Sequence, residues 1–118
     1  MATSKIPNLN KFDDVSIDKS TADPNISRLN AKRCGNIVYV FSENGFSTKF
    51  FDTSQTLYLG TIAVHPKENM NYIIPLRNGD DSTLQGYGGL TIAKDGKIYF
   101  LPLVAGYNLS FCITFPIV

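Results

Sequence analysis

The run LTIAKDGKIYFLPLV, residues 90–104, decides the fold class. It consists of two apolar segments separated by Asp95-Gly96, a pair that favours a tight turn between antiparallel strands. Neither segment has the spacing of apolar residues that an amphipathic helix requires. The run therefore predicts a β-hairpin, and the rest of the chain is interpreted outward from it.

Strand-like segments continue upstream of this hairpin, and no segment from Ile26 onward has a helical pattern. Asn44-Gly45 marks a further turn, and Pro75 restricts its strand to an edge or an end. The segments are SRLNAKRC (27–34), IVYVFS (37–42), QTLYLGTIAV (55–64) and MNYIIPL (70–76). Short strands separated by Gly, Asn and Asp predict an all-β fold, an antiparallel β-sandwich.

The last eleven residues, NLSFCITFPIV (108–118), form the most hydrophobic strand-like run of the chain. Every second residue is large and apolar, so these side chains share one face of a strand. They are Leu109, Phe111, Ile113, Phe115 and Ile117. We expect this face to line the core. We also expect the strand to be held inside a sheet, because an exposed apolar edge invites aggregation.

Two of the predicted strands carry apolar residues on both faces. In IVYVF, Ile37, Tyr39 and Phe41 alternate with Val38 and Val40. The segment KIYFLPLV (97–104) likewise has apolar residues on both faces. One face packs into the core of a sandwich, and the other predicts a covering partner, of which a second copy of the chain is the simplest. The alternative is an ordinary apolar patch of surface.

Length and charge limit the classes of protein to consider. The 118 residues suffice for one domain with its own core, and the net charge of +1 argues against a nucleic-acid partner. No apolar run reaches the ~18 residues needed to span a bilayer, and the N-terminus lacks a signal-peptide pattern. Residues 1–26 are polar and read as a linker, which leaves 27–118 as the β-domain. Cys34 and Cys112 are predicted to be free thiols, with a single disulfide bridge between them as the alternative.

The sequence offers no catalytic or metal-binding constellation. His65 is the only histidine and is expected in a solvated loop, while Asp80 and Asp81 are adjacent and typical of a turn. The glycines of GYGGL (86–90) are expected to form a tight loop rather than a phosphate-binding turn. We therefore expect a protein that is not an enzyme and uses no cofactor or metal.

The segment RNGDDSTLQGYGG (77–89) is the best candidate for binding. It combines amide, carboxylate and hydroxyl side chains with Tyr87, a mixture that suits saccharides, whose hydroxyls need polar partners and whose C–H faces pack on aromatic rings. An ordinary solvated loop has the same composition, so both interpretations stand at this point.

Several segments, taken in order, resemble the C-terminal head domain of bacteriophage and prophage tail-fibre and baseplate receptor-binding proteins. The resemblance covers about residues 27–118. It rests on NAKRCGNIVYVF (30–41), LGTIA (59–63), GGLTIAKDGKIYF (88–100), the step Gly106-Tyr107 and LSFCITFPIV (109–118).

This resemblance implies a jelly-roll-like β-sandwich that forms a homotrimer at the tip of a fibre. Its function would be non-enzymatic attachment to a bacterial cell-surface glycan or another host receptor, with no membrane insertion. Residues 1–26 would be the end of the fibre shaft or neck, joined to the remainder of the tail fibre. The protein would be made in the host cytoplasm and built into the virion.

Receptor contact is expected in the loops that follow strands. The residues proposed for it are Asn78, Asp80, Asp81, Thr83, Gln85, Tyr87, Asn44, Phe46, His65 and Lys67. Two alternatives remain open: a purely structural virion component, such as a fibre cap or connector, and an enzyme acting on surface polysaccharide. The enzyme would need converging acids, for which Asp80 and Asp81 are the only candidates.

Overall fold

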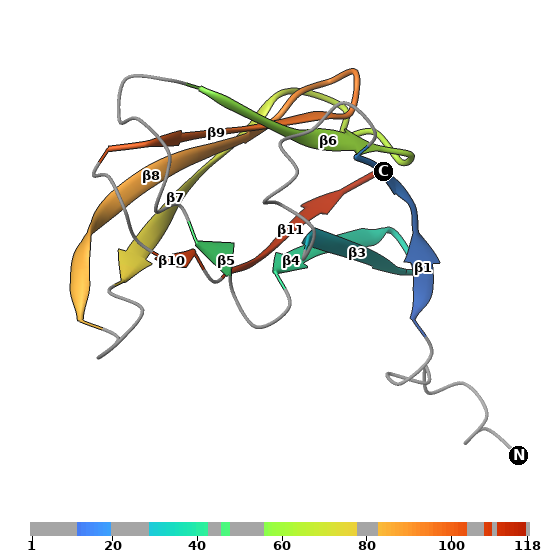
Figure 1. Cartoon of the computed structure of the whole chain (residues 1–118). Helices are drawn as coiled ribbons and strands as arrows, with labels where there is room; N and C mark the ends of the chain where they lie inside the picture. Colours follow the sequence, from blue (N-terminus) through green and yellow to red (C-terminus); the bar gives the residue numbers. More distant parts are fainter. Residues whose placement is uncertain are drawn as a thin grey trace, which may run out of the picture.

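A computed structural model describes residues 12–19, 29–42, 46–47, 56–77, 83–103, 108–109 and 111–117 of the chain (Figure 1). For Phe46, Ser47, Arg77, Gln85, Asn108 and Leu109 only the backbone is described. The described part is all-β, with no helix, and its strands form two antiparallel sheets. The predicted all-β antiparallel class is confirmed, and the arrangement is compatible with a β-sandwich.

The first sheet has four strands in the order β1-β3-β4-β11. They are β1 (Asp13–Val15), β3 (Leu29–Cys34), β4 (Ile37–Ser42) and β11 (Cys112–Pro116). The second has seven strands in the order β2-β6-β9-β8-β7-β10-β5. They are β2 (Ile17–Asp18), β5 (Phe46–Ser47), β6 (Leu57–Ile62), β7 (Met70–Arg77), β8 (Leu84–Ile92), β9 (Lys97–Pro102) and β10 (Asn108–Leu109).

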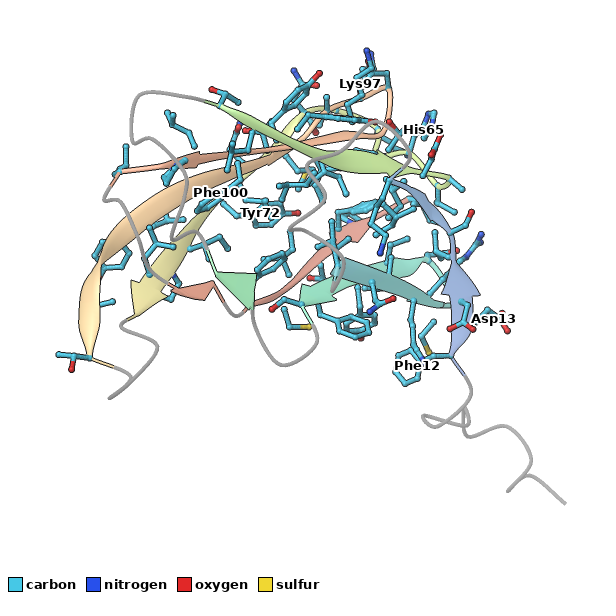
Figure 2. The ribbon with its side chains drawn as sticks, viewed as in Figure 1. Phe12, Asp13, His65, Tyr72, Lys97 and Phe100 are labelled. Carbon is cyan, nitrogen blue, oxygen red and sulfur yellow. The ribbon has the colours of Figure 1, made fainter. Side chains whose placement is uncertain are left out.

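The core lies between the two sheets, where Figure 2 places Phe100 and Tyr72. Every second residue of each long strand contributes to it, as the alternation of a strand requires. The buried apolar side chains are Leu29, Ala31, Val38, Val40 and Phe115 from the first sheet, and Leu59, Ile62, Ile74, Leu76, Leu90, Ile92, Ile98 and Phe100 from the second.

Two pairs of short strands carry the chain from one sheet to the other. At one side, β1 pairs with β3 and β2 pairs with β6, with only Ser16 between β1 and β2. At the other, β11 pairs with β4 and β10 pairs with β7. Strands that switch sheets form corners, and Figure 1 shows β1 at one side and β10 at the other. The two sheets are thus joined along both sides.

The hairpin predicted from residues 90–104 is confirmed, since β8 pairs with β9 antiparallel. Ala93 N–H donates to Lys97 O and Gly96 N–H donates to Ala93 O, which closes a three-residue loop ending in a positive φ of 90° at Gly96. A Cβ on Gly96 would lie 2.6 Å from Ile62 O. Glycine is therefore required here both by the turn and by the packing of the turn on the end of β6.

The glycines of GYGGL do not form the loop expected from the sequence. All three lie within β8; Gly86 has a positive φ of 156°, opposite a register shift in β7, whereas Gly88 and Gly89 do not have a positive φ. A Cβ on Gly88 would lie 2.3 Å from the Phe100 ring, so the glycine is there to admit an aromatic side chain. The glycine at position 88 therefore serves the packing of the core and does not form a turn.

β11 confirms one prediction and corrects another. Phe115 is fully buried while Phe111, Ile113 and Ile117 pack against the core, as the alternation predicts. The expectation that this strand lies inside a sheet is wrong, because β11 stands last in its sheet and pairs with β4 alone among the described strands. The side chain of Leu109 lies outside the described residues.

The hydrogen bonds of β11 show which of its backbone groups remain open. Ser42 N–H donates to Phe111 O and Ile117 N–H donates to Asn36 O, so the odd-numbered residues form the ladder with β4. The backbone groups of the even-numbered residues therefore point away from β4, toward the open edge.

Tyr72 and Pro116 protect this edge. The Tyr72 hydroxyl donates to Thr114 O at 2.7 Å, and Pro116 has no N–H to offer another strand. Tyr72 belongs to β7, whose backbone ladder with the terminal segment is confined to Leu76 and Arg77. The Tyr72 side chain thus bridges β7 and β11 beyond the point where the backbone pairing of β7 with β10 has ended.

Residues 13–18 differ from the linker expected over residues 1–26. They form β1 and β2, which pair with β3 and β6, and Ile17 and Val15 pack against the core. Phe12 also contacts the sheet, with its ring edge-on to Tyr39 at a centroid distance of 5.4 Å. The sandwich therefore begins earlier in the chain than the sequence pattern indicated.

Candidate functional site

The residues predicted to contact a receptor fall into separate groups. Asn44, Asn78, Asp80 and Asp81 lie outside the described residues, and for Phe46 and Gln85 only the strand backbone is described. The remaining four are all exposed. They are Thr83, Tyr87, His65 and Lys67.

The structure does not bring these four residues together. His65 and Lys67 lie in the connection before β7, and Thr83 lies just before β8, which starts opposite the far end of β7. Eight residues of antiparallel strand separate the two ends, or about 27 Å. His65 instead lies against Gly96, at the same end as Lys97 in Figure 2. A single site containing all the predicted loops is therefore not formed.

Tyr87 borders an apolar depression on the outer face of the seven-stranded sheet. The hollow measures about 490 Å³ and is lined by Ile73, Tyr87, Gly88, Gly89 and Leu103. β7, β8 and the end of β9 supply these residues, so the depression is built on paired strands rather than on loops. Such a support fixes the lining side chains more firmly than a loop does.

The register explains why the surface is hollow at this point. Ile73 pairs with Gly89, and Gly89 pairs with Leu101, so a residue without a side chain lies between two apolar ones. Nothing lies within 4 Å of the position of a Cβ on Gly89. Leu103 N–H donates to Tyr87 O. Tyr87 and Leu103 therefore lie side by side, next to the row formed by Ile73, Gly89 and Leu101 across the three strands.

The lining side chains are unusually exposed for their type. Ile73 is 78% exposed, Leu103 62% and Tyr87 47%. Among the described residues that line the depression, Tyr87 is the only one with a polar side chain. The depression offers contact area for an apolar surface, or for the C–H face of a sugar ring against Tyr87.

Polar groups lie one row away from the depression. The Thr91 hydroxyl donates to Asn71 Oδ1 at 2.8 Å, and both residues are on the outer face of the same strands. This mixture of an apolar hollow with polar side chains at its border is the usual composition of a binding surface.

Sequence analysis identified Tyr87 but missed Ile73, Gly89 and Leu103. The signal for Ile73 was present in MNYIIPL, where Tyr72 and Ile74 share one face and Ile73 necessarily points to the other. The signal for Gly89 was hidden, because consecutive glycines suggest a loop as readily as a strand.

The described part of the chain contains no group of three or more His, Cys, Asp or Glu side chains placed to hold a metal ion. No helix there is long and apolar enough to cross a membrane. Cys34 and Cys112 are free thiols, as predicted.

Comparisons with known proteins gave no match. No family model matches the chain, and no curated protein or solved structure is significantly similar to it. The resemblance to tail-fibre heads therefore stands on the sequence segments quoted for it.

Proposed function

We propose that this chain is the receptor-binding head of a phage or prophage tail fibre. In this proposal it is a non-enzymatic adhesin that recognises a bacterial cell-surface saccharide and acts as a homotrimeric, jelly-roll-like domain in the virion. With residues 13–18 paired into the sheets, the proposed connection to the fibre shaft lies before Asp13.

The observation that carries the proposal is the depression beside Tyr87. An aromatic ring, half exposed on a strand next to an open glycine, provides the flat apolar surface on which a sugar ring packs. In the sequence, the predicted contact residues Asp80, Asp81 and Thr83 come shortly before β8, the strand that contains Tyr87. They would supply polar partners for the sugar hydroxyls.

The proposed trimer is supported by apolar side chains that remain exposed on the outer faces. Ile37 of β4 and Leu101 of β9 are both 36% exposed, as the two-faced pattern of their strands predicts. Three linked copies would raise the avidity of sites that are individually weak. Light scattering on a sizing column is expected to give three times the 13.0 kDa chain mass. A monomer at micromolar concentration would contradict the trimer.

Receptor binding is tested on glycan arrays and on host cells. Tyr87→Ala is expected to lower binding by about tenfold, since stacking on an aromatic ring contributes on the order of 1 kcal/mol or more. Lys94→Ala, in the exposed β8–β9 turn, serves as the matched control and should bind normally. Loss of binding on Lys67→Ala with Tyr87→Ala unaffected would move the site to the opposite end of β7.

A structural virion component is the second candidate function. It is favoured by the composition of the depression, whose lining includes no charged side chain and whose only polar side chain is Tyr87. Such a surface also suits another protein of the virion. A trimer that binds neither glycans nor cells would support this alternative over the adhesin.

A further inference from the structure

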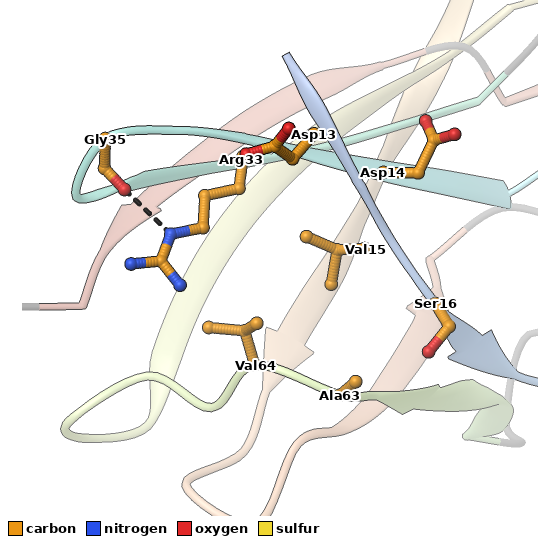
Figure 3. A pocket seen from close by; sticks show the side chains of 8 residues that line it. All are labelled: Asp13, Asp14, Val15, Ser16, Arg33, Gly35, Ala63 and Val64. Carbon is orange, nitrogen blue, oxygen red and sulfur yellow. Dashed lines mark hydrogen bonds between the residues drawn. The ribbon is translucent and has the colours of Figure 1, made fainter.

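A second hollow of about 480 Å³ lies at the corner where β1 passes into β2 (Figure 3). It shares no residue with the depression beside Tyr87. Its lining comes from β1 and Ser16, from β3 and the turn after it, and from the segment that follows β6. The lining residues are Asp13, Asp14, Val15, Ser16, Arg33, Gly35, Ala63 and Val64.

Arg33 is held in place from one side. Its Nε donates to Gly35 O at 2.8 Å, which fixes the guanidinium group at one end of the cleft. No carboxylate of the described residues lies within ion-pair distance of it, although Asp13 is opposite Arg33 in the β1–β3 register. The terminal nitrogens of Arg33 have no partner among the described residues, and a guanidinium in this state can donate two parallel hydrogen bonds to a carboxylate.

The other groups around the cleft define what else a ligand must carry. Figure 3 shows Val15 and Val64 between the guanidinium and the Ser16 hydroxyl, so the middle of the hollow is apolar. Asp14 forms an ion pair with Lys32 at 3.6 Å, whereas Asp13 is exposed at the rim. Asp13 accepts hydrogen bonds and Ser16 both donates and accepts them.

We propose that this corner cleft binds an acidic saccharide, a sugar of the uronic acid class. The sugar carboxylate pairs with Arg33, its hydroxyls bond to Asp13 and Ser16, and its C–H groups cover Val15 and Val64. A group with two charges, such as phosphate, is disfavoured, because Asp13 repels it and Lys32, a nearby cation among the described residues, is already paired with Asp14. The site is independent of Tyr87 and does not require the fibre-head function.

The cleft unites residues that are distant in the sequence. Asp13 and Arg33 are brought together by the pairing of β1 with β3, and Val64 comes from the segment that follows β6. His65, which was predicted to contact a receptor, directly follows Val64 but does not line the cleft. The binding groups are therefore fixed by the sheet corner itself.

The test is calorimetric titration of the full chain with galacturonate, which carries a single carboxylate, and with neutral galactose at low salt. The acidic sugar is expected to bind at least about tenfold more tightly, since a charge-assisted pair contributes roughly 1.5–3 kcal/mol. Arg33→Gln should lower the affinity for the acidic sugar at least tenfold. Arg33→Lys should have an intermediate affinity, because lysine keeps the positive charge but lacks the planar guanidinium that donates two parallel hydrogen bonds.

Two controls protect this interpretation. Lys94→Gln removes an exposed cation elsewhere, and Tyr87→Ala removes the other site, so both should bind galacturonate normally. Thermal melting of each variant checks that the fold is intact. The proposal would be overturned if the neutral sugar or inorganic phosphate bound as tightly as the acidic sugar. It would also be overturned if a folded Arg33→Gln protein bound the acidic sugar as the original does, or if the acidic sugar did not bind at millimolar concentration.

Discussion

Gly88 and Gly89 are neighbours in β8, yet their surroundings are opposite. A Cβ on Gly88 would lie 2.3 Å from the Phe100 ring and 2.9 Å from Leu101 O, while a Cβ on Gly89 would meet nothing within 4 Å. The first glycine faces the core and the second faces outward. One is required by packing, whereas the other leaves room on the outer face of the sheet.

The same contrast recurs on the neighbouring strand. Ile73 is 78% exposed and Ile74 is 3% exposed, although they are identical residues side by side in β7. The face of a sheet, rather than the residue type, thus decides which positions stabilise the fold and which remain available for binding. Four predictions test this distinction, starting with the largest effect.

Phe100→Ala is expected to lower the free energy of unfolding by about 3–5 kcal/mol, because it leaves a cavity over Gly88 in a buried position. Leu101→Ala, the adjacent residue on the outer face, is the matched control and should cost much less. Urea denaturation measures both. Similar losses for the two variants would show that the inner and outer faces of β9 are not distinguished as described.

Gly88→Ala is expected to destabilise by about 1–3 kcal/mol, since the added methyl group overlaps the Phe100 ring. Gly89→Ala should stay within about 0.5 kcal/mol of the original protein because its Cβ enters open space. The loss at Gly88 should shrink in a Phe100→Leu background, where the ring is absent. A Gly88→Ala protein as stable as the original would contradict the close contact.

Tyr72→Phe tests the bridge between β7 and β11, and it is expected to cost about 1 kcal/mol through the lost hydrogen bond to Thr114 O. Burial raises the pKa of Tyr72 above the ordinary value of 10.0. Its contribution to stability is therefore complete below about pH 10 and is lost as the pH rises through the folded-state pKa.

Chemical denaturation between pH 8 and pH 11 follows this effect. The stability difference between the original protein and Tyr72→Phe should be constant at the lower end of the range and decrease at the upper end. A difference that grows with increasing pH would have the wrong sign for a tyrosine whose pKa is raised by burial.

Ile73→Thr is expected to have the smallest effect on stability, within about 0.5 kcal/mol, because most of the side chain is already in water. Ile74→Thr, one residue along, should cost about 2 kcal/mol or more by placing a hydroxyl in the core. Melting curves of Ile73→Thr and Ile74→Thr compare the outer and inner faces of β7, as the two glycine variants do for β8. Equal melting temperatures for the two variants would refute it.

Sequence reasoning succeeded where a pattern was both local and long. Asp95-Gly96 between two apolar runs identified the β8–β9 hairpin, and the alternation of Phe111, Ile113 and Phe115 identified the inward face of β11. Each of these signals is contained in a few consecutive residues. The antiparallel all-β class followed from them.

It failed where a structure depends on partners that are distant in the chain. β1 and β2 together comprise five residues, too few to show a period, and their pairing with β3 and β6 is not visible locally. The edge position of β11 likewise follows from sheet order rather than from composition. The corner cleft was missed for the same reason, since Asp13, Arg33 and Val64 have no motif in common.

The strands that cross between the sheets also bear on how the chain folds. β11 pairs with β4 across roughly seventy intervening residues, and β1–β2 couples β3 to β6. Because both junctions must form before either sheet is complete, a half-folded species with one intact sheet gains little stability. Pairings of such high contact order predict slow, cooperative folding on a scale of milliseconds to seconds. The domain should therefore unfold in one transition, and tension on either end of the sandwich is shared by both sheets.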